Sequence, residues 1–341
     1  MKTILRRLGI GVTALALVAA GGCGSDDDGG ASGGGDQAAL EKVTYLTGVG
    51  VQGRESYVYV AQEKGFFREA GFEVEVKPGA GTVPNLKLLQ GGQADFAVLD
   101  ITGALIEYGR GNFKDFTIIS ALQQRNLACL MALEGSGVAG PKDLEGKRIA
   151  YIPGGVVRTL FDTYAKLAGF DASTVTWVNM PFQAMPAGLA SKRIDVATQF
   201  VVGKGFVESV GKRKAVVLPY SDYLVDLYGN GVAVTSKDAK ADPDRVRRFN
   251  EAILKGLAYA IEHPQEAGTI YAKFQKAQPP KAAGGEMALM APYVKSGGSG
   301  GVGALDQNRV ARNIAILQGA GTIPNSFQPE DVVSFDYLPK S

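Results

Sequence analysis

Short β-like runs alternate with amphipathic helical stretches along most of this chain, and the alternation occurs in two series. The first series begins at Val43, and the second follows Gly140-Pro141. Strand–helix–strand units build parallel sheets covered by helices, because parallel neighbours need a long crossover connection. The sequence therefore predicts an α/β protein with two lobes, each a mostly parallel sheet flanked by helices.

The expected elements are short and are bounded by turn residues. The first series has strands at 43–47, 72–76 and 96–99 and helices at 56–70, 84–89 and 103–108. The second has strands at 148–152, 175–178 and 194–198 and helices at 156–167 and 184–191. We expect 243–276 and 308–318 to be helical and to pack on the first lobe.

Two apolar segments flank the second series, at 127–133 and 231–235. We interpret them as crossover strands that join the lobes. The expected boundaries are 43–130 together with 228–341 for lobe 1 and 131–227 for lobe 2.

The N-terminal segment is typical of an export signal. Lys2, Arg6 and Arg7 precede an apolar run, Leu8 to Ala20, that is too short to span a bilayer. The small residues before Cys23 resemble the lipobox of bacterial lipoproteins. We expect a signal peptide at 1–22, lipidation at Cys23 and a flexible tether over 23–42; a plain secretory signal is the alternative. The export route, general or twin-arginine, stays open.

Composition excludes several classes of function. The 341-residue chain has a formal charge of +2 without a basic block, which argues against nucleic-acid binding. With one His (His263) and two Cys, most His-based catalytic and zinc sites lack the necessary residues. We expect no catalytic residue, no metal and no cofactor, a buried structural Cys129 and a surface His263.

Four segments carry a resemblance to a known family. AQEKGFFREAGFEV at 61–74 resembles a signature of bacterial solute-binding proteins, and LQGGQADFA (89–97), DLEGKRI (143–149) and GLASKRIDV (188–196) follow in the family's order. The nearest group binds sulfonates, nitrate, taurine or thiamine-pyrimidine precursors.

This resemblance implies a type II periplasmic-binding-protein fold with a small-molecule ligand between the lobes. It also implies a lipid-anchored monomer on the extracytoplasmic face of the cell membrane, with an ABC-transporter permease and ATPase as partners. An enzymatic branch of the fold makes the thiamine pyrimidine with an active-site His, pyridoxal phosphate and a Cys-rich iron motif. This chain has no His in its cleft loops and no Cys cluster, so we expect a binding protein and not an enzyme.

The ligand is expected beyond the carboxyl ends of the strands, where ligands bind in open α/β sheets. Loops there from both lobes supply the candidate residues, with helix N-termini that favour anions. The candidates are Arg54, Glu55, Tyr57, Thr82, Asp100, Thr102, Gly154, Gly155, Arg158, Thr159, Gln183, Gln199 and Tyr228.

Several candidates have a simpler explanation. Asp100 is also in position to cap the helix that follows it, Arg54 and Arg158 fit solvated surface charges, and Tyr57 and Tyr228 fit plain core aromatics.

The chemistry of the ligand stays open between three classes. The carboxylates Glu55 and Asp100 favour a planar nitrogen heterocycle of the thiamine-pyrimidine-precursor type, whereas the arginines suit an anion. A flavin-type vitamin is the second candidate and an alkanesulfonate the third. Six aromatic side chains are candidates for stacking on a ring. They are Tyr57, Phe182, Phe200, Tyr220, Tyr223 and Tyr228.

Overall fold

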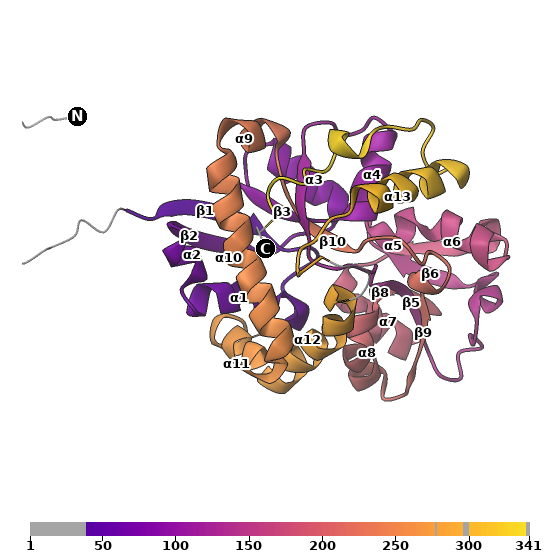
Figure 1. Ribbon diagram of the computed structural model, residues 1–341. Helices are drawn as coiled ribbons and strands as arrows, with labels where there is room; N and C mark the ends of the chain where they lie inside the picture. The colour runs from indigo at the N-terminus through magenta and orange to yellow at the C-terminus, as the bar shows by residue number, and fades with distance from the viewer. Residues whose placement is uncertain (1–38, 277, 296–299, 339–341) are drawn as a thin grey trace, which may run out of the picture. The chain divides into compact units, whose positions relative to one another are not determined.

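The computed structural model describes residues 39–276, 278–295 and 300–338, and these described residues belong to one compact unit. The predicted signal peptide, Cys23 and most of the predicted tether lie outside the described residues. Two five-stranded mixed sheets, each flanked by helices, form the framework of this unit (Figure 1). The predicted α/β architecture with two sheets is confirmed.

The first sheet has the strand order β2-β1-β3-β10-β4. Its first three strands are parallel and match the predicted runs, whereas β10 lies antiparallel between β3 and β4. The strands are β1 (Glu41–Leu46), β2 (Phe72–Lys77), β3 (Phe96–Asp100), β4 (Thr117–Ala121) and β10 (Asn230–Val234).

The second sheet repeats this plan with the order β7-β6-β8-β5-β9. Three parallel strands again match the predicted runs, and β5 lies antiparallel between β8 and β9. The strands are β5 (Ala128–Leu133), β6 (Arg148–Tyr151), β7 (Thr176–Asn179), β8 (Val196–Phe200) and β9 (Ala215–Pro219).

The helices of the first series connect and cover the first sheet. They are α1 (Ser56–Glu63), α2 (Phe66–Glu69), α3 (Thr82–Gln90) and α4 (Ile101–Gly109), and the 3₁₀ helix η1 (Gly53–Glu55) precedes α1. The helix predicted over 56–70 is divided into α1 and α2. Gly65 causes the division, because its φ of 79° is a left-handed conformation that a helix cannot continue through.

Nine further α-helices are described in the rest of the structure. The helix predicted over 156–167 is likewise present as two helices, α5 and α6. The nine are α5 (Val156–Thr159), α6 (Phe161–Ala168), α7 (Met185–Ala190), α8 (Lys204–Gly211), α9 (Ser236–Ala241), α10 (Pro243–Glu262), α11 (Pro264–Phe274), α12 (Pro280–Lys295) and α13 (Gln307–Gly319).

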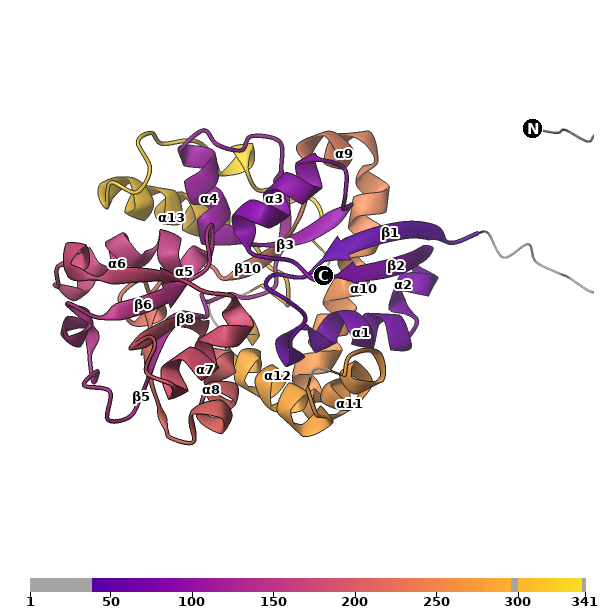
Figure 2. The ribbon, with the colours of Figure 1, turned by 180° about the vertical axis from the view of Figure 1, so that it is seen from behind.

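Helix α10 packs on the first sheet through Phe249, as predicted for this C-terminal region. The Phe249 ring stacks on Phe96 of β3 with centroids 3.7 Å apart and on Phe67 of α2 at 5.3 Å. Figures 1 and 2 show α10 on one face of this sheet and α3 on the other. The central strand β3 is therefore buried on both faces, in keeping with its apolar sequence, whereas the edge strand β2 exposes Glu73 and Glu75.

The chain passes between the sheets twice, over residues 122–127 and 220–229. We call these segments the first and second connections. The two runs interpreted as crossover strands are β5 and β10, and each follows one of the connections directly and pairs within one sheet. Cys129 in β5 is fully buried, and His263 between α10 and α11 is exposed, as predicted.

Candidate functional site

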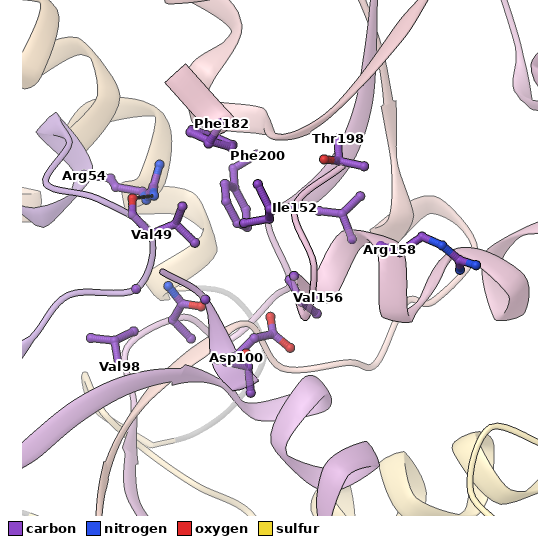
Figure 3. A pocket seen from close by; sticks show the side chains of 16 residues that line it. Val49, Arg54, Val98, Asp100, Ile152, Val156, Arg158, Phe182, Thr198 and Phe200 are labelled. Carbon is purple, nitrogen blue, oxygen red and sulfur yellow. Dashed lines mark hydrogen bonds between the residues drawn. The ribbon is translucent and has the colours of Figure 1, made fainter. Parts of the chain in front are cut away.

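A cavity of about 20 Å³ lies where the carboxyl ends of strands from both sheets meet (Figure 3). Asp100 is the last residue of β3 and Phe200 the last residue of β8, while Val49 and Ile152 follow β1 and β6. In this conformation the space suffices for one or two water molecules. The lining residues are Gly48, Val49, Arg54, Gly81, Thr82, Val98, Asp100, Ile152, Gly155, Val156, Val157, Arg158, Phe182, Thr198, Phe200 and Asn230.

The walls of the cavity are mainly apolar. Phe182 and Phe200 lie together on one side, with ring centroids 5.8 Å apart and planes tilted by 47°. Val49, Ile152 and Phe182 also border an outer hollow of about 470 Å³ that faces the same loops. The remaining residues of this hollow are Gly50, Pro78, Gly79, Ala80, Pro84, Pro153, Pro181 and Gln183.

The two lobes approach each other closely at Gly154. Its φ is 71°, and a Cβ at this position would lie 2.9 Å from the Cβ of Val83 in α3. A glycine is therefore required on both counts, because L-residues avoid this φ and because a side chain would collide with the facing lobe.

Asp100 is the carboxylate of the cavity, and its side chain is 5% exposed. Its Oδ1 accepts a hydrogen bond from the N–H of Gly103 at 2.8 Å, which caps α4, and its Oδ2 accepts one from Nδ2 of Asn126 at 2.8 Å. Burial raises the pKa of Asp100 from 3.8 to about 7, although these hydrogen bonds lower it. Asp100 thus caps a helix, as the simpler interpretation had it, and also lines the cavity.

Arg54 extends into the cavity from η1, but its charge is engaged within the first lobe. Nη2 donates to the carbonyl of Val49 at 2.9 Å, and Nε lies 3.3 Å from Oε1 of Glu55. Its guanidinium carbon lies 4.8 Å from the ring centroid of Phe200 in the other lobe. The backbone N–H of Arg54 donates to Oε2 of Glu286 at 3.1 Å. Burial raises the pKa of both glutamates, and the nearby Arg54 lowers it.

Arg158 borders the cavity, but its guanidinium points away from the other labelled side chains (Figure 3). The guanidinium carbon lies 4.3 Å from the ring of Trp177, and Nη1 lies 3.4 Å from Oδ1 of Asp162. The group is therefore engaged on the outside of the second lobe.

Of the thirteen predicted ligand-binding residues, the structure brings six to the cavity or to the outer hollow. Arg54, Thr82, Asp100, Gly155 and Arg158 line the cavity, and Gln183 lines the hollow.

The other seven do not line the cavity. Glu55 and Tyr57 bind each other behind Arg54, where the Tyr57 hydroxyl donates to Oε2 of Glu55 at 2.9 Å. Thr159 donates to its own helix at the carbonyl of Gly155, and Gln199 is buried in β8. The remaining three are Gly154, Thr102 and Tyr228.

The Tyr228 ring packs under Arg309, as the core interpretation expected, and its hydroxyl accepts a hydrogen bond from the N–H of Asp306 at 3.0 Å. Thr102 donates to the carbonyl of Tyr228 at 3.0 Å.

Sequence reasoning missed lining residues that belong to strands. Val98 and Thr198 lie inside β3 and β8, and Asn230 begins β10. A search confined to loops could not find them. Their position along the strands could have identified them. Val98 and Thr198 lie near the carboxyl ends of their strands, and Asn230 pairs with Asp100, which ends β3.

The described part of the chain has no group of three His, Cys, Asp or Glu side chains that could hold a metal ion. Within that part, no helix combines the length and the apolar character needed to cross a membrane.

The architecture is the type II periplasmic-binding-protein fold, with the cavity between its two lobes. The chain belongs to the NMT1/THI5-like family, whose family model matches residues 55–267. The resemblance stated from the sequence motifs is confirmed.

Three relatives of this chain differ in what their names describe. This chain is 25% identical over 230 residues to the 4-amino-5-hydroxymethyl-2-methylpyrimidine phosphate synthase of Legionella pneumophila. The match covers 66% of this chain and 71% of that protein. The chain is 24% identical over 238 residues to the formylaminopyrimidine-binding protein of Halalkalibacterium halodurans, covering 68% and 70%. The riboflavin-binding protein RibY of Chloroflexus aurantiacus is 25% identical over 248 residues, with 70% and 68% covered.

Among solved structures, the alkanesulfonate-binding protein SsuA from Xanthomonas axonopodis pv. citri, bound to MOPS, superposes with a TM-score of 0.69. The match covers 87% of this chain and 100% of that chain at 14% identity. At this identity the likeness establishes the fold and leaves the ligand undetermined.

Proposed function

We propose that this chain is an exported binding protein that captures a small planar nitrogen heterocycle, of the thiamine-pyrimidine-precursor type, and delivers it to an ABC importer. The observation that carries the proposal is the buried carboxyl of Asp100, with a pKa raised to about 7, in an apolar cavity between two lobes. A strongly perturbed group in a cleft is a candidate for function, because burying a carboxylate costs stability.

A heterocycle needs more room than the cavity has in this conformation, so the lobes must part to admit it. The walls then match the two kinds of surface that such a ligand presents. Phe182 and Phe200 offer aromatic faces to a ring. Asp100 and the amide of Asn230 offer hydrogen-bonding groups to ring nitrogens and amino groups at its edge. Few polar groups in an apolar pocket fix the orientation of a ligand.

The positive groups of the cavity argue against an anionic ligand. Arg54 is paired with Glu55, and the Arg158 guanidinium is directed outward. In this conformation an alkanesulfonate in the cavity would meet Arg54 already paired with Glu55, and the Arg158 guanidinium would have to turn inward to reach it. The outer hollow of about 470 Å³ favours a flavin-type ligand as the second candidate, since it offers room for a larger heterocycle.

A binding role is favoured over catalysis by the residue types at the site. Among the described residues that line the cavity there is no His, Cys or Lys. Histidine, cysteine and lysine, which often act as nucleophiles or bases, are therefore missing from its described walls, and Asp100 is the side chain there whose pKa would suit proton transfer. The alternative is an enzyme, because some of the relatives are named pyrimidine phosphate synthases. An assay for synthase activity must exclude it.

The lipid anchor at Cys23, the monomeric state, the lobe boundaries and the permease and ATPase partners belong to the same proposal. They rest on the sequence features and on the family.

A thermal-shift screen of the chain from residue 39 tests the proposal. A ligand at 100 times its dissociation constant should stabilise the folded state by about 2.7 kcal/mol. We expect aminopyrimidines or related heterocycles to raise the melting temperature and taurine and nitrate to leave it unchanged. Asp100→Ala should abolish the shift. As a matched control, Asp242→Asn alters an exposed helix cap remote from the cavity lining and should retain it. A shift with alkanesulfonates alone would overturn the ligand class.

A further inference from the structure

One buried side chain joins the cavity carboxylate to both connections between the lobes. Asn126 lies in the first connection and is 2% exposed. Its Nδ2 donates to Oδ2 of Asp100 at 2.8 Å and to the carbonyl of Tyr228, in the second connection, at 2.9 Å. Its Oδ1 accepts from the N–H of Ala128, the first residue of β5, at 2.8 Å.

We propose that Asn126 is a positioning residue that orients the Asp100 carboxylate for the ligand, favours its ionised form and ties it to both connections between the lobes. The inference rests on the proposed function, since it takes Asp100 as the group that meets the ligand. Asn126 does not itself line the cavity.

The hydrogen bonds of the Asn126 carboxamide leave it little freedom. Both Nδ2 hydrogens are used, one toward the cavity and one toward the second connection, while Oδ1 faces the second sheet. A displacement of either connection must therefore lengthen at least one of these buried bonds, and an unpaired buried polar group is costly.

The orientation of Asp100 depends on the same set of bonds. Gly103 fixes Oδ1 at the start of α4, and Asn126 fixes Oδ2. Thr102 donates to the carbonyl of Tyr228, the same carbonyl that Asn126 binds, so α4 is linked to the second connection as well. Hydrogen bonds to an ionised carboxylate are stronger than those to a neutral carboxyl. A ligand N–H that favours ionised Asp100 therefore also strengthens the bond to Asn126.

The connections are also linked on a side that does not border the cavity. Arg309 of α13 donates from Nη1 to Oε1 of Gln124 at 3.1 Å and from Nε to the carbonyl of Asp226 at 3.1 Å. Asn313 accepts from the N–H of Tyr228 at 3.3 Å. These residues bind the connections without touching Asp100, which makes Asn313 a matched comparison for Asn126.

Burial raises the pKa of Asp100, and hydrogen bonds from the backbone of Gly103, the side chain of Asn126 and the backbone of Thr102 lower it; of these donors, only the Asn126 amide can be removed by a side-chain substitution. Arg54 of η1 and Arg158 of α5 share the cavity but are paired with Glu55 and Asp162. The elements α3, α4 and β10 place neutral side chains beside it, Thr82, Thr102 and Asn230.

The test measures heterocycle affinity by calorimetry between pH 5 and pH 9. The affinity of the wild-type protein should rise as the pH increases and Asp100 ionises, and should then level off. Asn126→Ala removes a bond that favours the ionised form, so the midpoint of this rise should move to higher pH, with affinity at pH 8 about tenfold weaker. Asn313→Ala, which also removes a buried asparagine, should lower the melting temperature and leave the midpoint unchanged. Equal midpoints in the two variants would overturn the inference.

A second measurement needs no substitution and keeps the test decisive if Asn126→Ala fails to fold. The side-chain amide resonance of Asn126 should titrate with the Asp100 carboxyl in the NMR spectrum of the wild-type protein. An Asn126 amide resonance whose chemical shift does not change as Asp100 titrates would overturn the inference. If no heterocycle binds the wild-type chain, the proposed function fails, and the amide titration still decides whether Asn126 follows Asp100.

Discussion

Replacement of Asp100 by asparagine should stabilise the folded protein, and increasingly so as the pH rises. The pKa of Asp100 rises from 3.8 to about 7 on folding because the carboxyl is buried. The folded state therefore holds a proton that the unfolded state releases between these values. The stability that this proton contributes is complete below pH 3.8 and is lost as the pH rises toward 7.

The magnitude follows from the same pKa. Since one pH unit corresponds to about 1.4 kcal/mol, ionised Asp100 costs the folded state about 4 kcal/mol at pH 8. At pH 5 most of this cost is absent, so the effect of Asp100→Asn on the free energy of unfolding should differ between pH 5 and pH 8 by about 3 kcal/mol. The mismatch of the new amide with Nδ2 of Asn126 costs about 1 kcal/mol at both pH values and cancels in this difference.

Urea unfolding followed by Trp177 fluorescence at pH 5 and pH 8 measures the difference. The control is Asp242→Asn, which changes an exposed N-cap of α10 and should alter stability equally at both pH values. An Asp100→Asn effect that is the same at pH 5 and pH 8 would refute the reasoning, because Asp100 would then be an ordinary ionised helix cap.

Three further predictions concern the anchor, the walls and the lobes. Cys23→Ala should release the protein from the membrane fraction into the soluble exported fraction, and its retention in the membrane would contradict lipid anchoring. Phe200→Ala should weaken heterocycle binding by about tenfold, because the ligand ring loses its contact with the Phe200 ring. Phe206 is an exposed phenylalanine of α8, so the control Phe206→Ala should leave the affinity unchanged. Equal affinities of the two variants would show that Phe200 does not contact the ligand. We expect the lobes to close about the two connections when ligand binds, so small-angle scattering should give a smaller radius of gyration at ligand saturation. An unchanged radius would indicate a rigid pocket.

The parallel halves of both sheets could be predicted because their strands and helices alternate in the order of the chain. The strands β4 and β9 were not predicted, because neither belongs to this alternation of strands and helices. Each pairs with an antiparallel strand from a distant part of the sequence. Helix α12 was missed because Gly284, Gly285 and Pro292 lower its intrinsic helix propensity, and its packing against α11 and η1 outweighs that preference.

The site could be predicted as a region, because carboxyl ends of parallel strands meet at one edge of each sheet. Individual residues were harder to predict, since the direction of a side chain depends on the turn that carries it. Arg158 follows the expected strand, yet Trp177 and Asp162 draw its guanidinium outward. Tyr228 participates through its backbone carbonyl, and no pattern of side chains in the sequence reports that. Asn126 has no motif around it, and only the three-dimensional contacts reveal its position.

Isothermal titration of the chain from residue 39, with an aminopyrimidine and an alkanesulfonate compared under the same conditions, tests the central claim most directly. The account predicts saturable binding of one heterocycle per chain, lost in Asp100→Ala, and no binding of the sulfonate, because Arg54 and Arg158 are already engaged. Stoichiometric binding of the sulfonate with no response to any heterocycle would contradict it.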